Sequence, residues 1–131
     1  MGDEYMKELE INNNTFDNIK HIDEFGNEYW YARELMLALA YSKWGNFEKV
    51  IDKAKLACKQ SDNSILDHFA DVGKMVTIGS NAKRRQDDYK LSRYACYLIV
   101  QNADPRKEVI ALGQTYFAIQ TRRQEVADYF N

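Results

Sequence analysis

The stretch from Leu91 to Glu125 constrains the fold most, because it predicts two helices separated by a fixed stop. Ser92 offers the side-chain oxygen that an N-cap needs, and residues 94–100 are apolar throughout. A short helix that lacks a polar face belongs in the middle of a core. Asp104-Pro105 then supplies a second cap and a proline at the first helical position, where its missing N–H costs nothing. We therefore expect this helix pair to be the scaffold of the domain.

The second of these helices is expected to bury one apolar stripe, made of Val109, Leu112, Tyr116 and Ile119 and resumed by Val126 and Phe130. Gly113 interrupts the helix, which predicts a close approach by a neighbouring helix. Arg122 and Arg123 either extend a positive surface or, in the case of Arg123, pair with an acid or face a second subunit. The aromatic last turn leaves two alternatives open, docking on the domain or forming a homodimer.

Composition favours a single domain that does not span a membrane. The 131 residues are 45% hydrophobic and 29% charged, and no apolar run approaches the roughly 20 residues that cross a bilayer. The N-terminus lacks the pattern of a signal peptide, so we expect a cytoplasmic protein. Residues 1–18 are predicted to be an arm and residues 19–131 the domain. Cys58 and Cys96 each lie in an apolar helical pattern and are predicted to be core residues.

The net charge of −2 hides an asymmetry along the chain. Residues 1–34 hold nine acids and three bases, a balance of −6, which leaves +4 on the remainder. That balance is mild for a nucleic-acid-binding protein, so the placement of the cations matters more than their number.

Two hairpins and a helix pair are expected before Leu91. Gly26-Asn27 lies between the β-prone runs 19–22 and 28–30 and predicts the first hairpin. A helix over 32–41 and a second one capped by Asn46 form a helix-turn-helix-like unit. After a loop and a short helix over 60–71, the runs 72–78 and 89–91 predict a second hairpin around the polar segment 79–88. The expected fold is α+β, a mostly helical single domain with two small β-hairpins that resembles a winged helix.

The best candidate contacts for a ligand are cations at the tip of the second hairpin. Lys83, Arg84 and Arg85, with Lys90 and Arg93 close by in sequence, can neutralise the phosphates of DNA. The cations at positions 83 to 85 and 93 are expected to lie together on one solvent-facing surface. The alternative is a solvated loop in which Asp87 and Asp88 offset two of the charges.

A second group of candidate contacts lies at the turn before the helix that Asn46 caps. Lys43, Lys49 and Lys53 can reach phosphates from the start of this helix. Trp44 either stacks on an unpaired base or closes the core under the turn, and we favour the packing role.

Catalysis has little support in the sequence, so a non-enzymatic protein without cofactor or metal is expected. His21 and His68 lie on separate elements, no His/Cys cluster has metal-ligand spacing, and no glycine-rich phosphate loop is present. One alternative remains. Asp88-Tyr89-Lys90 has the look of a nuclease strand, with Asp67 and Asp71 as conceivable metal ligands.

Several long strings give the chain a resemblance to a known family. GSNAKR, LSRYACYLI, QNADP and GQTYFAIQTR occur between residues 79 and 125, and WYAREL lies at residues 30–35. From about Ile19 onward the sequence resembles the bacterial DNA-damage-inducible protein D family. It is more distantly similar to the N-terminal domains of phage antirepressors and of the viral BRO proteins.

The resemblance implies a non-enzymatic, DNA-associated domain of the SOS response, located at the nucleoid. Family members are typically longer than this chain. The family is linked to DNA binding, duplex or single-stranded, and to restraint of the RecA recombinase filament. The alternative is a protein-interaction module that meets the recombinase without touching DNA. Lys83, Arg84, Arg85 and Arg93 fall inside the matching strings, and no catalytic residue carries over.

Overall fold

The computed structural model describes residues 16–130, so most of the predicted N-terminal arm lies outside the described residues. Residues 16–19 are helical, and the side chain of Phe16 is buried against Tyr116 and Phe117. The packed domain thus includes residue 16, three residues before the predicted boundary.

The first hairpin forms as predicted. Strand β1 (His21–Ile22) pairs with β2 (Glu28–Tyr31) across a tight turn. The carboxylate of Asp23 accepts hydrogen bonds from the amides of Phe25 and Asn27, at 2.9 and 2.8 Å. Gly26 adopts a φ of +83°, a conformation that side chains disfavour, which explains the glycine at this turn.

Two helices follow, α2 (Ala32–Ala38) and α3 (Trp44–Gln60). The second begins two residues before Asn46, so the prediction that Asn46 caps this helix is wrong. Trp44 supplies the reason, because its indole N–H donates to Glu48 one turn later and its ring packs on Tyr89. These contacts hold Trp44 within the first helical turn.

The second hairpin is longer than predicted. After α4 (Ile65–His68) and β3 (Phe69–Asp71), strand β4 (Lys74–Ile78) pairs with β5 (Ala82–Gln86), and only residues 79–81 make the turn. The cations expected at the tip therefore lie in β5. Strand β6 (Tyr89–Leu91) pairs with β2 and β3, which gives a four-stranded sheet in the order β1-β2-β6-β3.

The scaffold helices are α5 (Arg93–Asn102) and α6 (Glu108–Phe130). As predicted, the hydroxyl of Ser92 caps α5 by accepting a hydrogen bond from the amide of Ala95. The predicted start of the next helix at Pro105 is wrong. Asp104 instead closes a turn by binding the backbone amide and the guanidinium of Arg106, and α6 begins at Glu108.

The buried stripe of α6 also differs from the prediction. Ile110, Tyr116 and Phe117 are buried, whereas Val109 and Ile119 are only half-buried. Gly113 is buried, and a close approach by a neighbouring helix at this position stays a prediction. Residues 121–129 are exposed, and Arg122 pairs with Glu125 on the same helix. A homodimer through this end of α6 stays a prediction.

The core lies between the sheet and helices α2, α3 and α5, and the α+β prediction is confirmed. Its largest fully buried side chains are Trp30 and Leu91 from the sheet and Phe47, Ile51 and Ile99 from the helices. Cys58 and Cys96 are buried, as predicted, and are not joined by a disulfide. The likeness to a winged helix stays a prediction.

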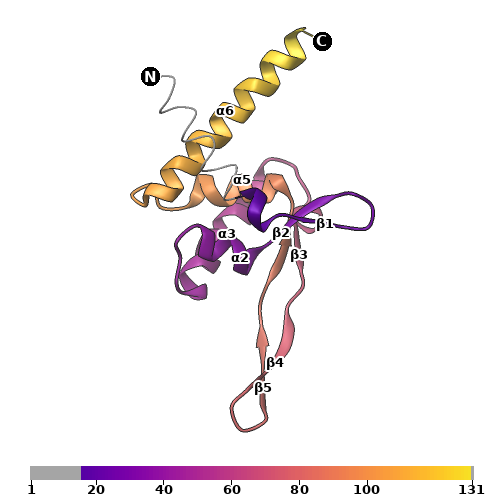
Figure 1. The fold of residues 1–131 in the computed structure, drawn as a ribbon, viewed down its shortest axis with the longest axis vertical. Helices are drawn as coiled ribbons and strands as arrows, with labels where there is room; N and C mark the ends of the chain where they lie inside the picture. The colour runs from indigo at the N-terminus through magenta and orange to yellow at the C-terminus, as the bar shows by residue number, and fades with distance from the viewer. Residues whose placement is uncertain (1–15, 131) are drawn as a thin grey trace.

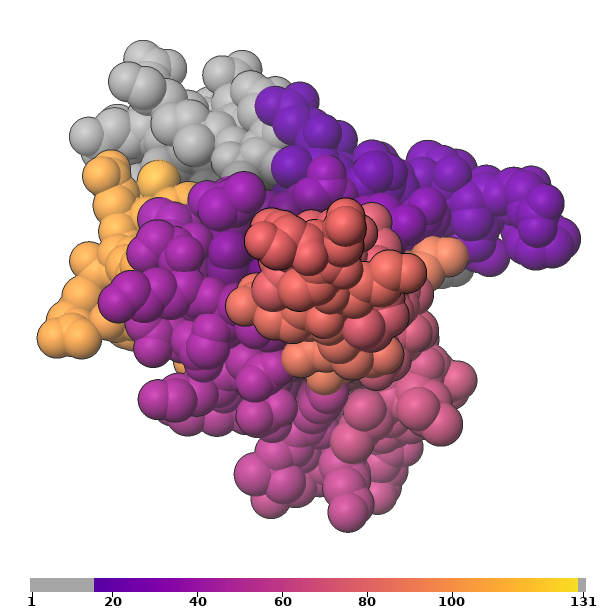
Figure 2. All heavy atoms as spheres, turned by 90° about the horizontal axis from the view of Figure 1, so that it is seen from below, coloured from indigo at the N-terminus to yellow at the C-terminus, as the bar shows by residue number. Residues whose placement is uncertain are grey.

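Figure 1 shows β4 and β5 projecting from one end of this body and α6 leaving the other end. Figure 2, viewed from below, shows the hairpin in front of the body and the loop between β1 and β2 standing out to one side. No helix among residues 16–130 has the length and hydropathy needed to cross a bilayer.

Candidate nucleic-acid interface

The projecting hairpin continues the central sheet without a change of register. Phe69 pairs with Leu91 in the sheet, Lys74 pairs with Gln86 in the hairpin, and between them the amide of Val72 donates to the carbonyl oxygen of Asp88 at 3.1 Å. Residues 69–78 and 82–91 therefore form one two-stranded ribbon. We call its free part, β4 and β5 with their turn, the arm.

The register assigns each arm side chain to one of two faces, because directly paired residues in antiparallel strands point to the same side. One face continues onto the sheet surface opposite the core, and we call it the outer face. Its members are Lys74, Val76, Ile78, Arg84 and Gln86 on the arm, and His21, Tyr29, Tyr31, Ala70 and Lys90 on the sheet. The inner face holds Asp71, Gly73, Met75, Thr77, Lys83, Arg85 and Tyr89.

The three predicted tip cations are consequently divided between the faces. Arg84 lies on the outer face, whereas Lys83 and Arg85 lie on the inner face. All three side chains are exposed. The expectation that they share a single surface is wrong, because neighbouring residues of a strand point to opposite sides.

Arg85 is occupied by ion pairs at the base of the arm. One of its terminal nitrogens lies 2.8 and 3.0 Å from the carboxylate oxygens of Asp71, and its Nε lies 3.1 Å from Asp87. Two carboxylates thus offset its charge, as the solvated-loop alternative anticipated for Asp87. Arg85 holds the two strands together where the arm leaves the sheet.

Gly73 leaves the space that the Arg85 guanidinium fills. A Cβ atom at this position would lie 2.6 Å from Nη2 of Arg85 and 3.1 Å from the carbonyl oxygen of Gln86. Gly73→Ala is therefore expected to displace the guanidinium from Asp71 and to speed amide exchange in β4 and β5, with the body unchanged. Hydrogen–deuterium exchange checks this. Gly45→Ala is the control, since its Cβ would contact nothing within 4 Å. Equal amide protection of the arm in both variants would contradict the role of the Arg85–Asp71 ion pair in holding the strands together.

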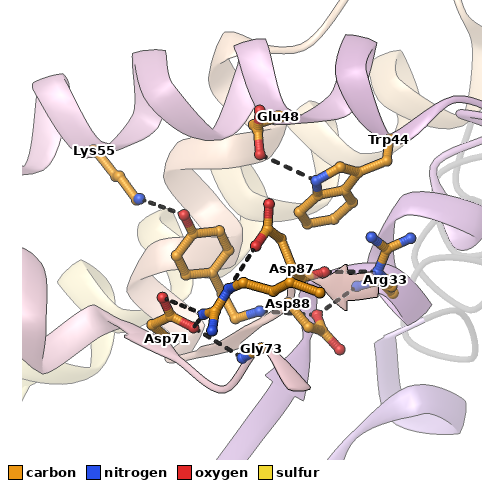
Figure 3. Close-up of polar contacts among 10 residues, drawn as sticks. Arg33, Trp44, Glu48, Lys55, Asp71, Gly73, Asp87 and Asp88 are labelled. Atoms are coloured by element: carbon orange, nitrogen blue, oxygen red, sulfur yellow. Dashed lines mark hydrogen bonds and ion pairs between the residues drawn. The ribbon is translucent and has the colours of Figure 1, made fainter. Parts of the chain in front are cut away.

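Trp44 belongs to the packing between α3 and the base of the arm (Figure 3). Its ring lies between the Arg33 guanidinium, 4.4 Å from the ring centroid, and the ring of Tyr89, stacked at 6.5 Å. Lys55 donates to the Tyr89 hydroxyl at 2.8 Å. The structure thus supports the packing role of Trp44 over base stacking.

Arg93 lies in an ion pair with Glu28. The Arg93 Nε and Nη2 atoms lie 2.6 and 3.1 Å from the two carboxylate oxygens, and the guanidinium also lies over the ring of Trp30. Hydrogen bonding to Arg93 holds the pKa of Glu28 below its usual value of 4.5, and the same bond raises the pKa of Arg93. This predicted DNA contact therefore has a structural partner.

The Glu28–Arg93 pair predicts a pH-dependent contribution to stability. Because the pKa of Glu28 is lowered in the folded state, the contribution is present above pH 4.5 and disappears as the pH falls through the lowered pKa. Glu28→Gln is expected to reduce the free energy of unfolding at pH 7 by about 1 kcal/mol or less, since the pair is partly exposed. Urea denaturation at pH 7 and pH 3 checks this. If the free energies of unfolding of wild type and Glu28→Gln differ equally at both pH values, the contribution assigned to the Glu28–Arg93 pair is contradicted.

The outer face carries cations that form no ion pair with the acids nearby. In the part of the chain that the structure describes, no carboxylate lies within ion-pair distance of Lys74, Arg84 or Lys90. The acids on this side are engaged elsewhere: one Asp88 oxygen accepts the backbone amides of Arg33 and Tyr89. Glu34 bonds to His21 at 2.6 Å.

Aromatic rings continue this basic surface towards β1. The Lys90 ammonium lies 4.0 Å from the ring centroid of Tyr29, and the His21 ring stacks on Tyr29 at 5.3 Å. Tyr31 packs edge-on against both rings. A hollow of about 380 Å³ connects the rings with the arm, lined by Tyr31, Glu34, Val72, Lys74, Gln86 and Asp88.

Sequence reasoning missed Lys74 and the aromatic group. Lys74 stands immediately before the β-prone run 75–78, so its place at the start of a strand was visible. Its pairing with Gln86 was not visible, because the polar segment 79–88 has no strand pattern and predicts a loop. Of the three rings, His21 and Tyr29 fall in the predicted first hairpin, His21 is otherwise considered only as a metal ligand, and Tyr31 has no predicted role.

The remaining predicted contacts lie away from the arm. Lys43, Lys49 and Lys53 are exposed at the start and along the first half of α3. Lys49 and Lys53 line a cleft with residues of the loop between α5 and α6, and Lys43 is not among its lining residues. Of the predicted cations, Lys83, Arg84 and Arg85 therefore lie on the arm and Lys49 and Lys53 line this cleft, whereas Lys43 belongs to neither group.

The alternative nuclease site is not brought together. Asp88 and Lys90 share the outer face, but Asp71 lies on the inner face and is bound by Arg85. No group of three His, Cys, Asp or Glu side chains within residues 16–130 is placed to hold a metal ion.

Comparison with known proteins shows to which family the chain belongs. The model of the BRO family N-terminal domain matches residues 18–118, which covers most of the chain and every element from β1 to the first half of α6. The chain belongs to the BRO family. The structural elements of this BRO domain that carry the outer face, β1 to β6, all lie within the matched residues.

A relative with a curated name is DNA damage-inducible protein D of Escherichia coli (strain K12). It is 58% identical to this chain over 113 residues, which make up 86% of the chain and 41% of the relative. The BRO domain described here thus spans about two fifths of that protein, and the family resemblance seen in the sequence is confirmed. No solved structure matches the chain significantly.

Proposed function

We propose that this BRO domain binds DNA through the outer face, as a non-enzymatic module of the bacterial DNA-damage response. The observation that carries the proposal is that Lys74 and Arg84 of the arm share one face with Lys90 of the sheet. Neutralisation of DNA phosphates by such cations releases counterions and drives binding. On the inner face Arg85 is paired with Asp71 and Asp87, so Lys83 is the one arm cation there without an ion-pair partner within residues 16–130, fewer than on the outer face.

The energetics of the arm also favour a contact role. A two-stranded hairpin is at best marginally stable by itself in water, and within residues 16–130 β4 and β5 pair only with each other. Met75 and Ile78 on the arm remain 60% and 42% exposed, so the arm buries little apolar surface. Its residues therefore add little to the stability of the domain and are available for a partner. A two-stranded ribbon has the width to enter the major groove of DNA.

The role in the damage response is extended from the relative. The Escherichia coli protein is named for its induction by DNA damage and shares 58% identity with this chain over the aligned residues. We extend that role to this domain, and with it a cytoplasmic location at the nucleoid.

Fluorescence anisotropy with labelled duplex and single-stranded DNA tests the proposal. Binding is expected at 50 mM salt, and the logarithm of the binding constant should fall linearly with the logarithm of the salt concentration. If Lys74, Arg84 and Lys90 each neutralise one phosphate, they contribute about −3 to that slope on a duplex. Absence of binding at 50 mM salt, or a binding constant that salt does not change, would overturn the proposal.

A second candidate function is contact with a protein, and the exposed apolar side chains of the arm favour it. Both arm strands have a free edge, and an exposed edge can accept a strand from a partner. The family resemblance names the RecA recombinase as that partner. Under this alternative, the domain binds RecA in the absence of DNA, and Met75→Ser weakens the complex while DNA binding is absent.

A further inference from the structure

A basic cleft lies at the start of α3, apart from the arm. It has a volume of about 520 Å³ and lies between three segments: the turn before α3, the first half of α3, and the connection from α5 to α6. We call it the lysine cleft. The side chains that matter to its chemistry are Ser42, Asn46, Lys49, Lys53, Asn102 and Lys107.

Two of its lysines have no partner among the described residues. Lys49 and Lys53 stand one turn apart on the same side of α3, where side chains four residues apart are neighbours. Both are exposed, and neither forms an ion pair within residues 16–130. Glu48, next to Lys49 in the chain, accepts the indole N–H of Trp44 at 3.1 Å.

The third lysine is fixed at the opposite wall. The Lys107 ammonium donates to the carbonyl oxygen of Ala40 at 2.7 Å and lies 4.3 Å from the ring centroid of Tyr41. The backbone of Ala40 has a φ of 62°, so this bond stabilises an uncommon turn conformation. Lys107 thus supplies a positive charge that is already positioned before any ligand arrives.

The one carboxylate in the cleft is already paired. Asp104 is held by Arg106 through bonds of 3.0 and 2.8 Å, which lower its pKa to about 2. The lining therefore keeps an excess of positive charge. Ser42 and Asn46 add side-chain donors that bond to no described residue, and the Asn102 amide donates to Leu98, which leaves its oxygen as an acceptor.

We infer that the lysine cleft is a phosphate-binding site, in which Lys49 and Lys53 contact the anion and Lys107 provides fixed positive charge. Three ammonium groups and two polar donors around a cleft suit a phosphodiester or a nucleotide phosphate. The source expected here is the backbone of DNA bound by the domain. That part of the inference rests on the proposed function, whereas the phosphate chemistry of the cleft does not.

Matched double variants test the inference in the whole chain. Lys49→Ala/Lys53→Ala removes two charges from the cleft. Lys20→Ala/Lys59→Ala removes the same charge from positions that do not line it. The cleft variant is expected to reduce the slope of binding against salt by about 1 to 2 relative to wild type, and the control to leave it unchanged. Equal slopes in all three proteins would overturn DNA as the source.

A second measurement keeps the cleft separate from the arm. Inorganic pyrophosphate is titrated into isotope-labelled protein, and backbone amide signals of residues 41–53 and 102–107 are followed by NMR. Saturable shifts there in wild type, lost in the cleft variant, support the site even if the domain binds no DNA. Shifts that are absent, or that persist in the cleft variant, overturn it. If DNA binding depends on the cleft but not on Lys74 and Arg84, the arm proposal fails and the cleft stands.

Discussion

Lys74→Glu/Arg84→Glu is expected to abolish most DNA binding by this domain. The two side chains lie on the outer face of a hairpin that projects into solvent, and neither has a carboxylate partner within residues 16–130. If each cation contributes roughly tenfold to the affinity, about 1.4 kcal/mol, the loss is about a hundredfold before repulsion is added. Anisotropy titrations at 0.1 M salt measure the effect.

A charge-matched control separates contact from net charge. Lys59→Glu/Lys83→Glu changes the charge of the protein equally, but at the end of α3 and on the inner face of the arm. Its binding is expected to fall much less. A comparable loss in both variants would show that overall charge, rather than the outer face, governs the interaction. Because the substituted side chains are exposed, each variant is expected to fold. Circular dichroism checks this.

The largest expected effect on stability is that of Trp30→Ala. Trp30 is 1% exposed, faces the core from β2, and donates its indole N–H to the carbonyl oxygen of Phe16 at 3.0 Å. Removal of a buried aromatic side chain costs about 3–5 kcal/mol, a large share of the 5–15 kcal/mol that is typical of a domain. Urea denaturation should show a correspondingly lower midpoint.

Leu66→Ala provides the comparison for this substitution. Leu66 is 81% exposed on α4, so loss of its side chain leaves no cavity and should change the free energy of unfolding by about 0.5 kcal/mol or less. A similar cost for both substitutions would contradict the assignment of the core to the inner side of the sheet.

Elements with local signals were predictable from the sequence. The bounds of α5 follow from the Ser92 cap and from an apolar run that has to be buried, and both features are present in the structure. The first hairpin follows from the glycine at its turn. In these segments the residues that determine the structure are neighbours in the chain.

The arm could not be predicted in the same way. Strand β5 is exposed on both faces, so its sequence, AKRRQ, has no apolar alternation to reveal a strand. The polar segment therefore predicts a loop, with its three adjacent cations on one surface. The register of the hairpin sends Arg84 to one side and Arg85 to the other.

Pairing over long distances in the sequence limited the prediction of the site. Arg93 bonds to Glu28, which is 65 residues away, and Arg85 bonds to Asp71, which is 14 residues away. No local sequence pattern predicts ion pairs between residues so far apart in the chain. The caps proposed at Asn46 and Asp104 were wrong for a related reason: Trp44 is held by Tyr89 from a distant strand, and Lys107 by the carbonyl oxygen of Ala40.

The salt dependence of DNA binding by Arg84→Ala and Lys83→Ala tests the central claim most directly. The two residues are adjacent, exposed cations of one strand and differ in the face that they occupy. Binding through the outer face predicts that Arg84→Ala lowers the slope by about 1 and that Lys83→Ala leaves it at the wild-type value. Equal slopes for the two variants, or a loss confined to Lys83→Ala, would contradict it.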